Sequence, residues 1–171
     1  PLIKYFNDNE LTKNKKLLII SEQGLGDTIQ FMRYIPYLKN QGFDITFCAQ
    51  EKLHSIIKSS KIDQAPLKPK EAINIKHGDC ISLLSIPKIL GVSPAEPIIT
   101  NPYIKVQDNL IKKWKDNLSN EKSPIIGINW QGNPQAEKNY LKGRSFSLEA
   151  FESITKNNDC TFLSLQKGFG S

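Results

Sequence analysis

The sequence predicts an α/β protein with a parallel sheet, and two observations support this class. Four consecutive apolar residues at 17–20 indicate a strand buried on both faces, and helical periodicity follows over residues 28–40. Strand and helix patterns then alternate again over residues 44–60. A β-α-β-α order favours parallel strands joined by right-handed crossovers, as in a Rossmann-like lobe.

Length and composition narrow the class of protein. The 171 residues suffice for one core, or for one domain and part of another. Apolar residues make up 39% and charged residues 23%, which is typical of a soluble globular protein, and no apolar run approaches the ~20 residues that span a bilayer. The net charge of +6 favours anionic ligands, and no nucleic-acid-binding motif is present, so no nucleic-acid partner is expected.

The cysteine pattern indicates a reducing compartment. Cys48, Cys80 and Cys160 are odd in number, widely spaced and set among apolar neighbours. This favours buried thiols over a disulfide framework and therefore a cytoplasmic protein. His77 and Cys80 lie close in sequence, but nothing nearby completes a zinc ligand set, so no metal site is expected.

The first 90 residues are expected to form an irregular polar segment followed by alternating strands and helices. Residues 1–16 form a polar lead-in. Pro36 should bend the helix over 28–40, and Gly42 should end it. The remaining expected elements are a strand over 44–49, a helix over 52–60, a short strand over 72–75, and a strand end followed by a short helix over 80–90.

Residues 92–103 hold four prolines without periodicity, which predicts a linker or crossing segment. We therefore expect an N-terminal lobe over 1–103 and a second region over 104–171. The second region predicts a helix over 108–118, strands over 124–130 and 160–165, and a helix over 148–156 with Ser147 as N-cap. Two strands make no stable sheet alone, so they either join the first sheet or begin an incomplete second lobe.

The stretch from residue 17 to 28 organises the rest of the chain. Gly24 and Gly26 suit a tight turn between strand and helix, and Asp27 stands where the helix begins. A helix N-terminus attracts anions, but Asp27 would repel a phosphate bound directly there. Position alone favours Asp27 as a helix cap, and the same carboxylate could also accept a proton.

Several motifs resemble the family 9 glycosyltransferase module, in the subgroup found after tetratricopeptide repeats in bacterial proteins. The matching segments fall in family order along the chain, from residue 16 to residue 168. They are Lys-Leu-Leu-Ile at 16–19, Glu-Gln-Gly-Leu-Gly-Asp-Thr-Ile-Gln-Phe at 22–31, Ser-Leu-Leu-Ser-Ile-Pro at 82–87, Trp-Gln-Gly-Asn-Pro at 130–134, Arg-Ser at 144–145 and Phe-Leu-Ser-Leu-Gln-Lys-Gly at 162–168.

The resemblance implies a GT-B architecture of two Rossmann-like lobes, heptosyltransferase-like, that performs an inverting, metal-independent sugar transfer. The N-terminal lobe would hold a polar or anionic acceptor, and the second lobe would hold a nucleotide-sugar, which is a substrate and not a cofactor. Asp27 would be the general base that removes the acceptor hydroxyl proton. The residues that would bind substrate are Gln23, Gly24, Leu25, Gly26, Trp130, Gly132, Asn133, Lys142, Arg144 and Lys167.

One departure from the family pattern limits these expectations. The family's nucleotide-sugar lobe continues through an Asp-Thr-x-x-x-His-like segment that nothing here matches. The sequence also begins at Pro1 without Met, so we expect an excerpt of a longer protein, with tetratricopeptide repeats as a possible N-terminal neighbour. We expect the isolated chain to be inactive or very weak, and its exposed apolar surface to promote self-association.

Two other functions stay open. Gly24 and Gly26 supply two-thirds of a dinucleotide fingerprint, and Glu51 stands where a ribose-binding acid would be, which suggests an NAD(P)- or nucleotide-binding protein. Against this, the third glycine position is Ile29, and Asp27 would face the pyrophosphate. The remaining class is a non-catalytic GT-B-like module that binds partners.

Overall fold

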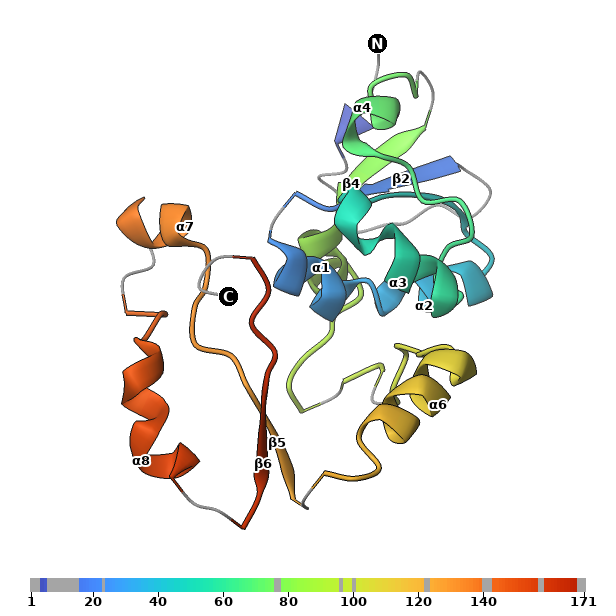
Figure 1. Cartoon of the computed structure of the whole chain (residues 1–171). Helices are drawn as coiled ribbons and strands as arrows, with labels where there is room; N and C mark the ends of the chain where they lie inside the picture. The colour runs from blue at the N-terminus through green and yellow to red at the C-terminus, as the bar shows by residue number, and fades with distance from the viewer. Residues whose placement is uncertain are drawn as a thin grey trace. The chain divides into compact units, whose positions relative to one another are not determined.

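The computed structural model describes residues 4–5, 16–22, 24–75, 78–95, 97–99, 101–121, 124–139, 143–156 and 159–168. The chain forms two compact units, Pro1–Leu110 and Ile111–Ser171, and each is described by itself. Both units contain parallel strands with helices between them, which confirms the α/β class (Figure 1).

The first unit contains a parallel sheet of four strands in the order β1-β4-β2-β3. The strands are β1 (Lys4–Tyr5), β2 (Lys16–Ile20), β3 (Asp44–Cys48) and β4 (Asp79–Ser82). β2 lies between β3 and β4, with Leu17 opposite both Ile45 and Asp79. The predicted buried strand is therefore correct. β1 was not predicted, because an edge strand of two residues leaves no apolar pattern in a polar stretch.

The predicted helix over 28–40 is two helices. α1 (Leu25–Phe31) begins three residues earlier than expected, and α2 (Tyr34–Asn40) follows a break at Met32 and Arg33. Pro36 explains the break, because it has no N–H to bond to the Met32 carbonyl and its ring would clash there. Ile35 N bonds to that carbonyl instead, at 3.1 Å.

The other helices of the first unit are short. They are η1 (Glu51–Leu53), α3 (His54–Ser59), α4 (Pro69–Ala72), η2 (Leu83–Ser85) and α5 (Ile86–Ile89). The strand predicted over 72–75 was wrong. Pro69 starts α4 at a position where its missing N–H costs nothing, and Lys68 N donates to Glu71 Oε2 at 2.7 Å to close the first turn.

The sheet has a large core on one face and a small one on the other. Figure 1 shows α1, α2 and α3 on one side of β2 and β4, and α4 on the opposite side. Successive residues of a strand point to opposite faces, so β2 contributes to both cores. The larger core includes Leu17, Ile19, Met32, Ile35, Leu38, Phe47, Ile57, Ile81, Leu83 and Ile86. The smaller one consists of Leu18, Cys48, Ala72 and Cys80.

The proline-rich segment that follows α5 belongs to the first unit. Val92, Ile99, Tyr103 and Ile104 pack against the larger core. Just beyond them, Lys105 N donates to Ser60 Oγ at 2.9 Å. Of the two alternatives, a crossing segment describes these residues better than a free linker.

The second unit is built on a separate sheet of two parallel strands, β5 (Ile125–Ile128) and β6 (Thr161–Ser164). Its helices are α7 (Pro134–Asn139), η3 (Leu148–Phe151) and α8 (Glu152–Thr155), and α6 (Asp108–Asn117) spans the division between the units. Ser147 starts η3 as expected, but without a side-chain cap hydrogen bond. No helix was predicted where α7 lies. Asn133 Oδ1 accepts from Gln135 N at 3.0 Å to start it.

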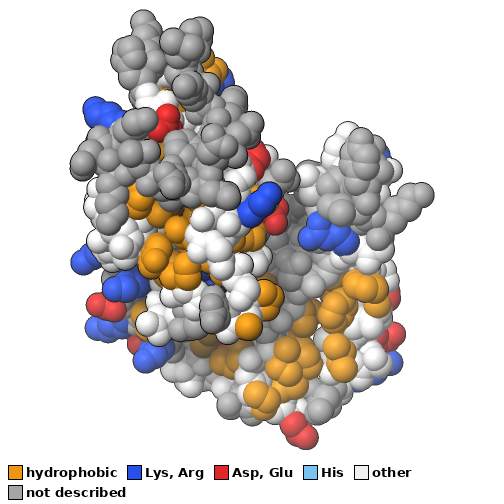
Figure 2. Space-filling view, turned by 180° about the vertical axis from the view of Figure 1, so that it is seen from behind, with side chains coloured by type: hydrophobic (Ala, Val, Ile, Leu, Met, Phe, Trp, Pro, Cys, Tyr) orange, Lys and Arg blue, Asp and Glu red, His pale blue; other side chains and the backbone are white. Residues whose placement is uncertain are grey.

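Apolar side chains of the second unit reach its surface. Ile125 and Ile126 are 40% and 38% exposed, although they point to opposite faces of the sheet. Phe146 and Leu165 are more than 60% exposed. Figure 2 shows hydrophobic side chains at this surface. Among the described residues, no helix has the length and apolar character needed to cross a bilayer.

Candidate functional site

The winding direction of the first sheet reverses at β2. The chain continues from β2 to β3 on one side, and β4 is added on the other side. In open α/β sheets, ligands bind outside the carboxyl ends of the strands where the order reverses in this way. Glu22 directly follows β2 and Ser82 ends β4, and the Ser82 hydroxyl donates a hydrogen bond to Glu22 Oε1. This contact ties the two strand ends together at the reversal.

The turn from β2 to α1 places Asp27 at the same edge of the sheet. Gly24 is the N-cap residue, with φ −64° and ψ 165°, and its N–H donates to Asp27 Oδ2 at 3.1 Å. The expectation that Asp27 itself is the N-cap residue was wrong, because α1 begins at Leu25 and Gly24 is the N-cap. Asp27 is the third residue of the helix, and its carboxylate closes the first turn by accepting the N–H of the N-cap residue. Asp27 is half-buried, while Leu25 is 41% exposed.

The two glycines of this turn have different roles from those expected. Neither adopts positive φ, so the turn does not need glycine for conformational freedom. A Cβ on Gly24 would lie 3.1 Å from Asp27 Oδ2, whereas a Cβ on Gly26 would meet no atom within 4 Å. Gly24 is thus favoured by its close approach to Asp27, and Gly26 leaves open space beside the turn. Gln23 lies outside the described residues.

A buried polar network lies beneath this turn, and the sequence did not reveal it. Thr28 Oγ1 donates to Gln50 Oε1 at 2.9 Å, and the Ser21 hydroxyl contacts both Thr28 Oγ1 and Gln50 Oε1. Thr28 is fully buried and Ser21 is 8% exposed. Polar residues at the ends of two strands, at 21 and 50, were the only sequence signal for it.

In the second unit, residues 130–132, Ser145 and Gln166 come together at the carboxyl ends of β5 and β6. Gln166 Oε1 accepts from the backbone N–H groups of Trp130 and Gln131, at 3.2 and 3.0 Å, and Gln166 Nε2 donates to Gln131 O at 3.1 Å. Gly132 N donates to Ser145 Oγ at 2.9 Å. A Cβ on Gly132 would lie 3.0 Å from Glu137 Oε1, so the loop packs closely there.

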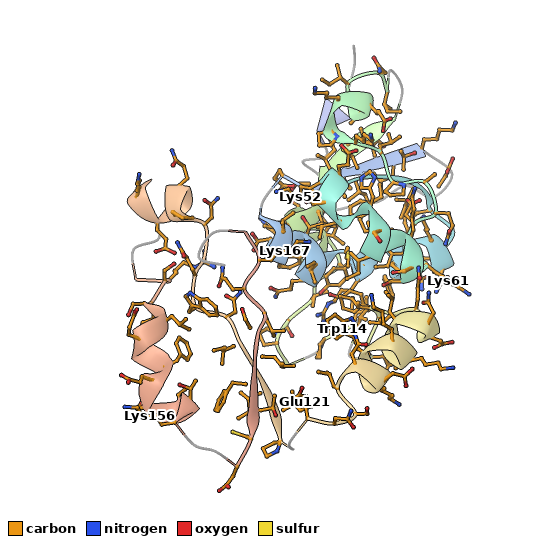
Figure 3. All side chains as sticks on the ribbon, viewed as in Figure 1. Lys52, Lys61, Trp114, Glu121, Lys156 and Lys167 are labelled. Carbon is orange, nitrogen blue, oxygen red and sulfur yellow. The ribbon has the colours of Figure 1, made fainter. Side chains whose placement is uncertain are left out.

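These contacts decide which groups could hold an anion. The backbone N–H groups of 130–132 already bond to side chains, so they are not an empty cradle for a phosphate. Arg144 and Lys167 are exposed and form no ion pair with the described residues. Lys167, labelled in Figure 3, follows β6, and Arg144 precedes Ser145. Lys142 lies outside the described residues.

Among ionisable groups, Glu51 has a distinct environment just beyond β3. Lys68 Nζ lies 2.7 Å from Glu51 Oε1, and its hydrogen bond holds the pKa of that carboxyl below its usual value. On the smaller core face, burial raises the pKa of the Cys48 and Cys80 thiols. Both thiols are free, so they are buried, protonated side chains.

Within the described part of the chain, no group of three or more His, Cys, Asp or Glu side chains is arranged to hold a metal ion. His77 lies outside that part.

The fold and the site together define an α/β protein with polar groups gathered at the carboxyl ends of its parallel strands. Comparison with protein-family models, curated proteins and solved structures finds no match for this chain.

Proposed function

We propose that this chain carries the acceptor side and part of the donor side of an inverting, metal-independent glycosyltransferase with the GT-B architecture. The observation that carries the proposal is the placement of Asp27 beside the strand reversal at β2, on the turn whose sequence resembles the family's opening motif. The convergence of 130–134, 145 and 166 at one end of the second sheet supports it.

Asp27 has the geometry of a base that is held in place by its own helix. Its Oδ2 accepts the Gly24 N–H, and among the described residues Oδ1 has no hydrogen-bond partner. In the proposed step, Asp27 takes the proton of an acceptor hydroxyl. The hydroxyl oxygen attacks the anomeric carbon, and the bond from that carbon to the diphosphate oxygen breaks with inversion. General base catalysis of this kind contributes about 10²- to 10⁴-fold in rate.

The donor side would stabilise the negative charge that develops on the leaving nucleoside diphosphate. The Arg144 guanidinium can bind a diphosphate through two parallel hydrogen bonds, and Lys167 can supply a second positive charge. Trp130 is half-buried beside the loop and offers a flat apolar surface. Lys142 is proposed for the same side by resemblance alone.

Dinucleotide binding is the weaker alternative. Ile29 occupies the third glycine position, and its side chain packs against the larger core. Asp27 keeps a carboxylate at the turn where a pyrophosphate would bind. Glu51, the expected ribose-binding acid, begins η1 three residues beyond the end of β3, and Lys68 already binds it.

The deciding experiment locates binding on the chain by amide resonance shifts. A panel of nucleotide-sugars and NAD are titrated separately into a Trp114→Phe variant, in which Trp130 is the one tryptophan left. We expect a nucleotide-sugar to shift residues 130–134, 144 and 167 and to change Trp130 fluorescence. NAD binding with shifts at Gly24 and Gly26 would replace the proposal with the dinucleotide alternative. Binding of neither would favour a non-catalytic module.

A pair of variants then separates the two roles of Asp27. Asp27→Asn keeps an oxygen that can accept the Gly24 N–H, whereas Asp27→Ala removes the cap, at a cost of about 1 kcal/mol. We expect Asp27→Asn to keep most of the stability of the parent chain and Asp27→Ala to be less stable. Both variants should lose any release of nucleoside diphosphate that depends on the acceptor. Release that persists in Asp27→Asn would remove Asp27 as the base.

A further inference from the structure

Gln50 connects the end of β3 to the turn that carries Asp27. It lies two residues beyond β3, and Ala49 between them is fixed, because Ala49 N donates to Leu67 O at 3.0 Å. Leu53 N donates to Gln50 O at 2.9 Å, which anchors the backbone of Gln50 on the other side. The carboxamide is therefore held on a backbone fixed on both sides.

From Gln50, a continuous chain of hydrogen bonds leads to the carboxylate. Gln50 Oε1 accepts from Thr28 Oγ1 at 2.9 Å. Thr28 also approaches Gly24 O with its backbone N at 3.1 Å and its hydroxyl at 3.2 Å. Gly24 N in turn donates to Asp27 Oδ2 at 3.1 Å.

The number of hydroxyl protons in the network shows why the acceptor on Gln50 decides how the Ser21 and Thr28 hydroxyls are oriented. Ser21 and Thr28 have one hydroxyl proton each, and these protons share three acceptors: Gln50 Oε1, Gly24 O and the other hydroxyl. If Thr28 donates to Gln50, the Ser21 hydroxyl can donate to Thr28 Oγ1, and both protons are used. Thr28 is fully buried, so its hydroxyl has no access to water. If the acceptor at Gln50 were lost, the Thr28 hydroxyl would have to turn toward another acceptor of the turn, such as Gly24 O.

We propose that Gln50 is a positioning residue: through the Ser21 and Thr28 hydroxyls it fixes Gly24 and the start of α1, and so the direction of the Asp27 carboxylate. Its importance for sugar transfer rests on the proposed function, but its effect on the turn does not. In this role Gln50 touches neither the acceptor nor the reacting atoms, and it acts through the Ser21 and Thr28 hydroxyls.

The test measures the turn directly. The Gly24 N–H is held by its hydrogen bond to Asp27 Oδ2, so its rate of exchange with solvent deuterium reports on that bond. Gln50→Met keeps the length of the side chain and removes the acceptor, whereas Gln50→Glu keeps an oxygen acceptor. We expect Gln50→Met to speed the exchange of the Gly24 amide by at least twofold and Gln50→Glu to leave its exchange rate unchanged. Thr28→Val removes the hydroxyl with little change in shape and should have the same effect on the Gly24 amide as Gln50→Met. It replaces Gln50→Met in the test if that variant fails to fold.

The control for general destabilisation is Ile57→Val, in the buried core on α3. It should lower the stability of the fold and leave the exchange rate of the Gly24 amide unchanged. An unchanged exchange rate in both Gln50→Met and Thr28→Val, or an equal increase in Ile57→Val, would overturn the positioning role. Because the readout needs no substrate, its failure is distinct from a failure of the proposed sugar transfer, which the binding titrations measure.

Discussion

The Tyr103 hydroxyl donates a hydrogen bond to the Ile29 carbonyl oxygen and so joins the crossing segment to α1. The Arg33 guanidinium lies over the same ring, with 4.9 Å between its Cζ and the ring centroid. Arg33 Nε also donates to Gln30 O at 2.8 Å. Tyr103 and Arg33 therefore close the larger core around the break between α1 and α2.

The first prediction concerns this contact. Tyr103→Phe removes one hydrogen bond and keeps the ring, so the free energy of unfolding of the first unit should fall by about 1 kcal/mol. Tyr103→Ala should cost more, because it also removes the ring beneath Arg33. Chemical denaturation of the chain measures both. Tyr37→Phe is the matched control, since no hydrogen bond of the Tyr37 hydroxyl is found among the described residues, and a loss as large as that of Tyr103→Phe would contradict the assignment.

The second prediction compares two glycines of positive φ. Gly78 has φ +132°, and a Cβ there would lie 2.7 Å from the Lys16 carbonyl oxygen. Gly42 has φ +89° with nothing within 4 Å of the added atom. Gly42→Ala should therefore cost only the backbone strain, about 1 kcal/mol, and Gly78→Ala should cost about 2–3 kcal/mol or more. Equal denaturation midpoints for the two variants would show that the approach of Gly78 to β2 is not tight.

The elements that were predictable from sequence are those with strong local patterns. β2 is a run of apolar residues because both of its faces are buried, and Gly42 ends α2 with positive φ as its position predicted. β1 and α4 have two and four residues, too few for a period to show. The stretch at 72–75 is apolar enough to suggest a strand, but Pro69 and Glu71 close a helical turn just before it.

The residues of the candidate site also fall into some that the sequence pointed to and some that it did not. Asp27 stood out in the sequence because the motif and the start of a helix coincide there, although the structure places the N-cap three residues earlier, at Gly24. The Gln50 network was not, because it joins residues 22 and 29 positions apart that meet only once β2 and β3 pair. The Gln166 contacts likewise join residues 35 and 36 positions apart. Such polar contacts depend on strand register, which propensity and periodicity do not reveal.

The third prediction is a pKa. The hydrogen bond from Lys68, followed by its charge, lowers the pKa of the Glu51 carboxyl. A depressed pKa means that this pair stabilises the fold above the unfolded-state pKa, and that the contribution disappears as the pH falls through the folded-state pKa. Lys68→Met should therefore raise the pKa of Glu51 toward its ordinary value, which a carboxyl-carbon NMR titration measures. Lys70→Met is the control and should shift it less, because Lys70 contributes the smallest part of the effect.

The fourth prediction follows from the exposed apolar side chains of the second unit. Phe146 and Leu165 are 62% and 63% exposed, and surfaces of this kind promote association. Sedimentation velocity should show the chain associating as its concentration rises, and the double variant Phe146→Ser, Leu165→Ser should associate less. Ile73→Ser removes a more exposed apolar side chain, at 79%, from the first unit and should have little effect. A strictly monomeric chain at all concentrations would refute the expectation of self-association.

The last prediction tests whether Gln166 holds the second unit together beyond the ends of its strands. Its carboxamide accepts two backbone N–H groups and donates to one carbonyl, so it extends the β5–β6 pairing by a side chain. Gln166→Ala leaves the N–H groups of Trp130 and Gln131 without this acceptor, and the second unit should lose about 1–3 kcal/mol of stability. Gln166→Glu keeps the acceptor and loses the donor, so it should lie between Ala and the parent chain. Urea unfolding followed by Trp130 fluorescence in the Trp114→Phe background measures this, with the exposed Gln135→Ala on α7 as control. If Gln166→Ala unfolds at the same urea concentration as Gln135→Ala, the loop over 130–134 is held by other contacts, and the carboxamide is not what brings the motif segments together.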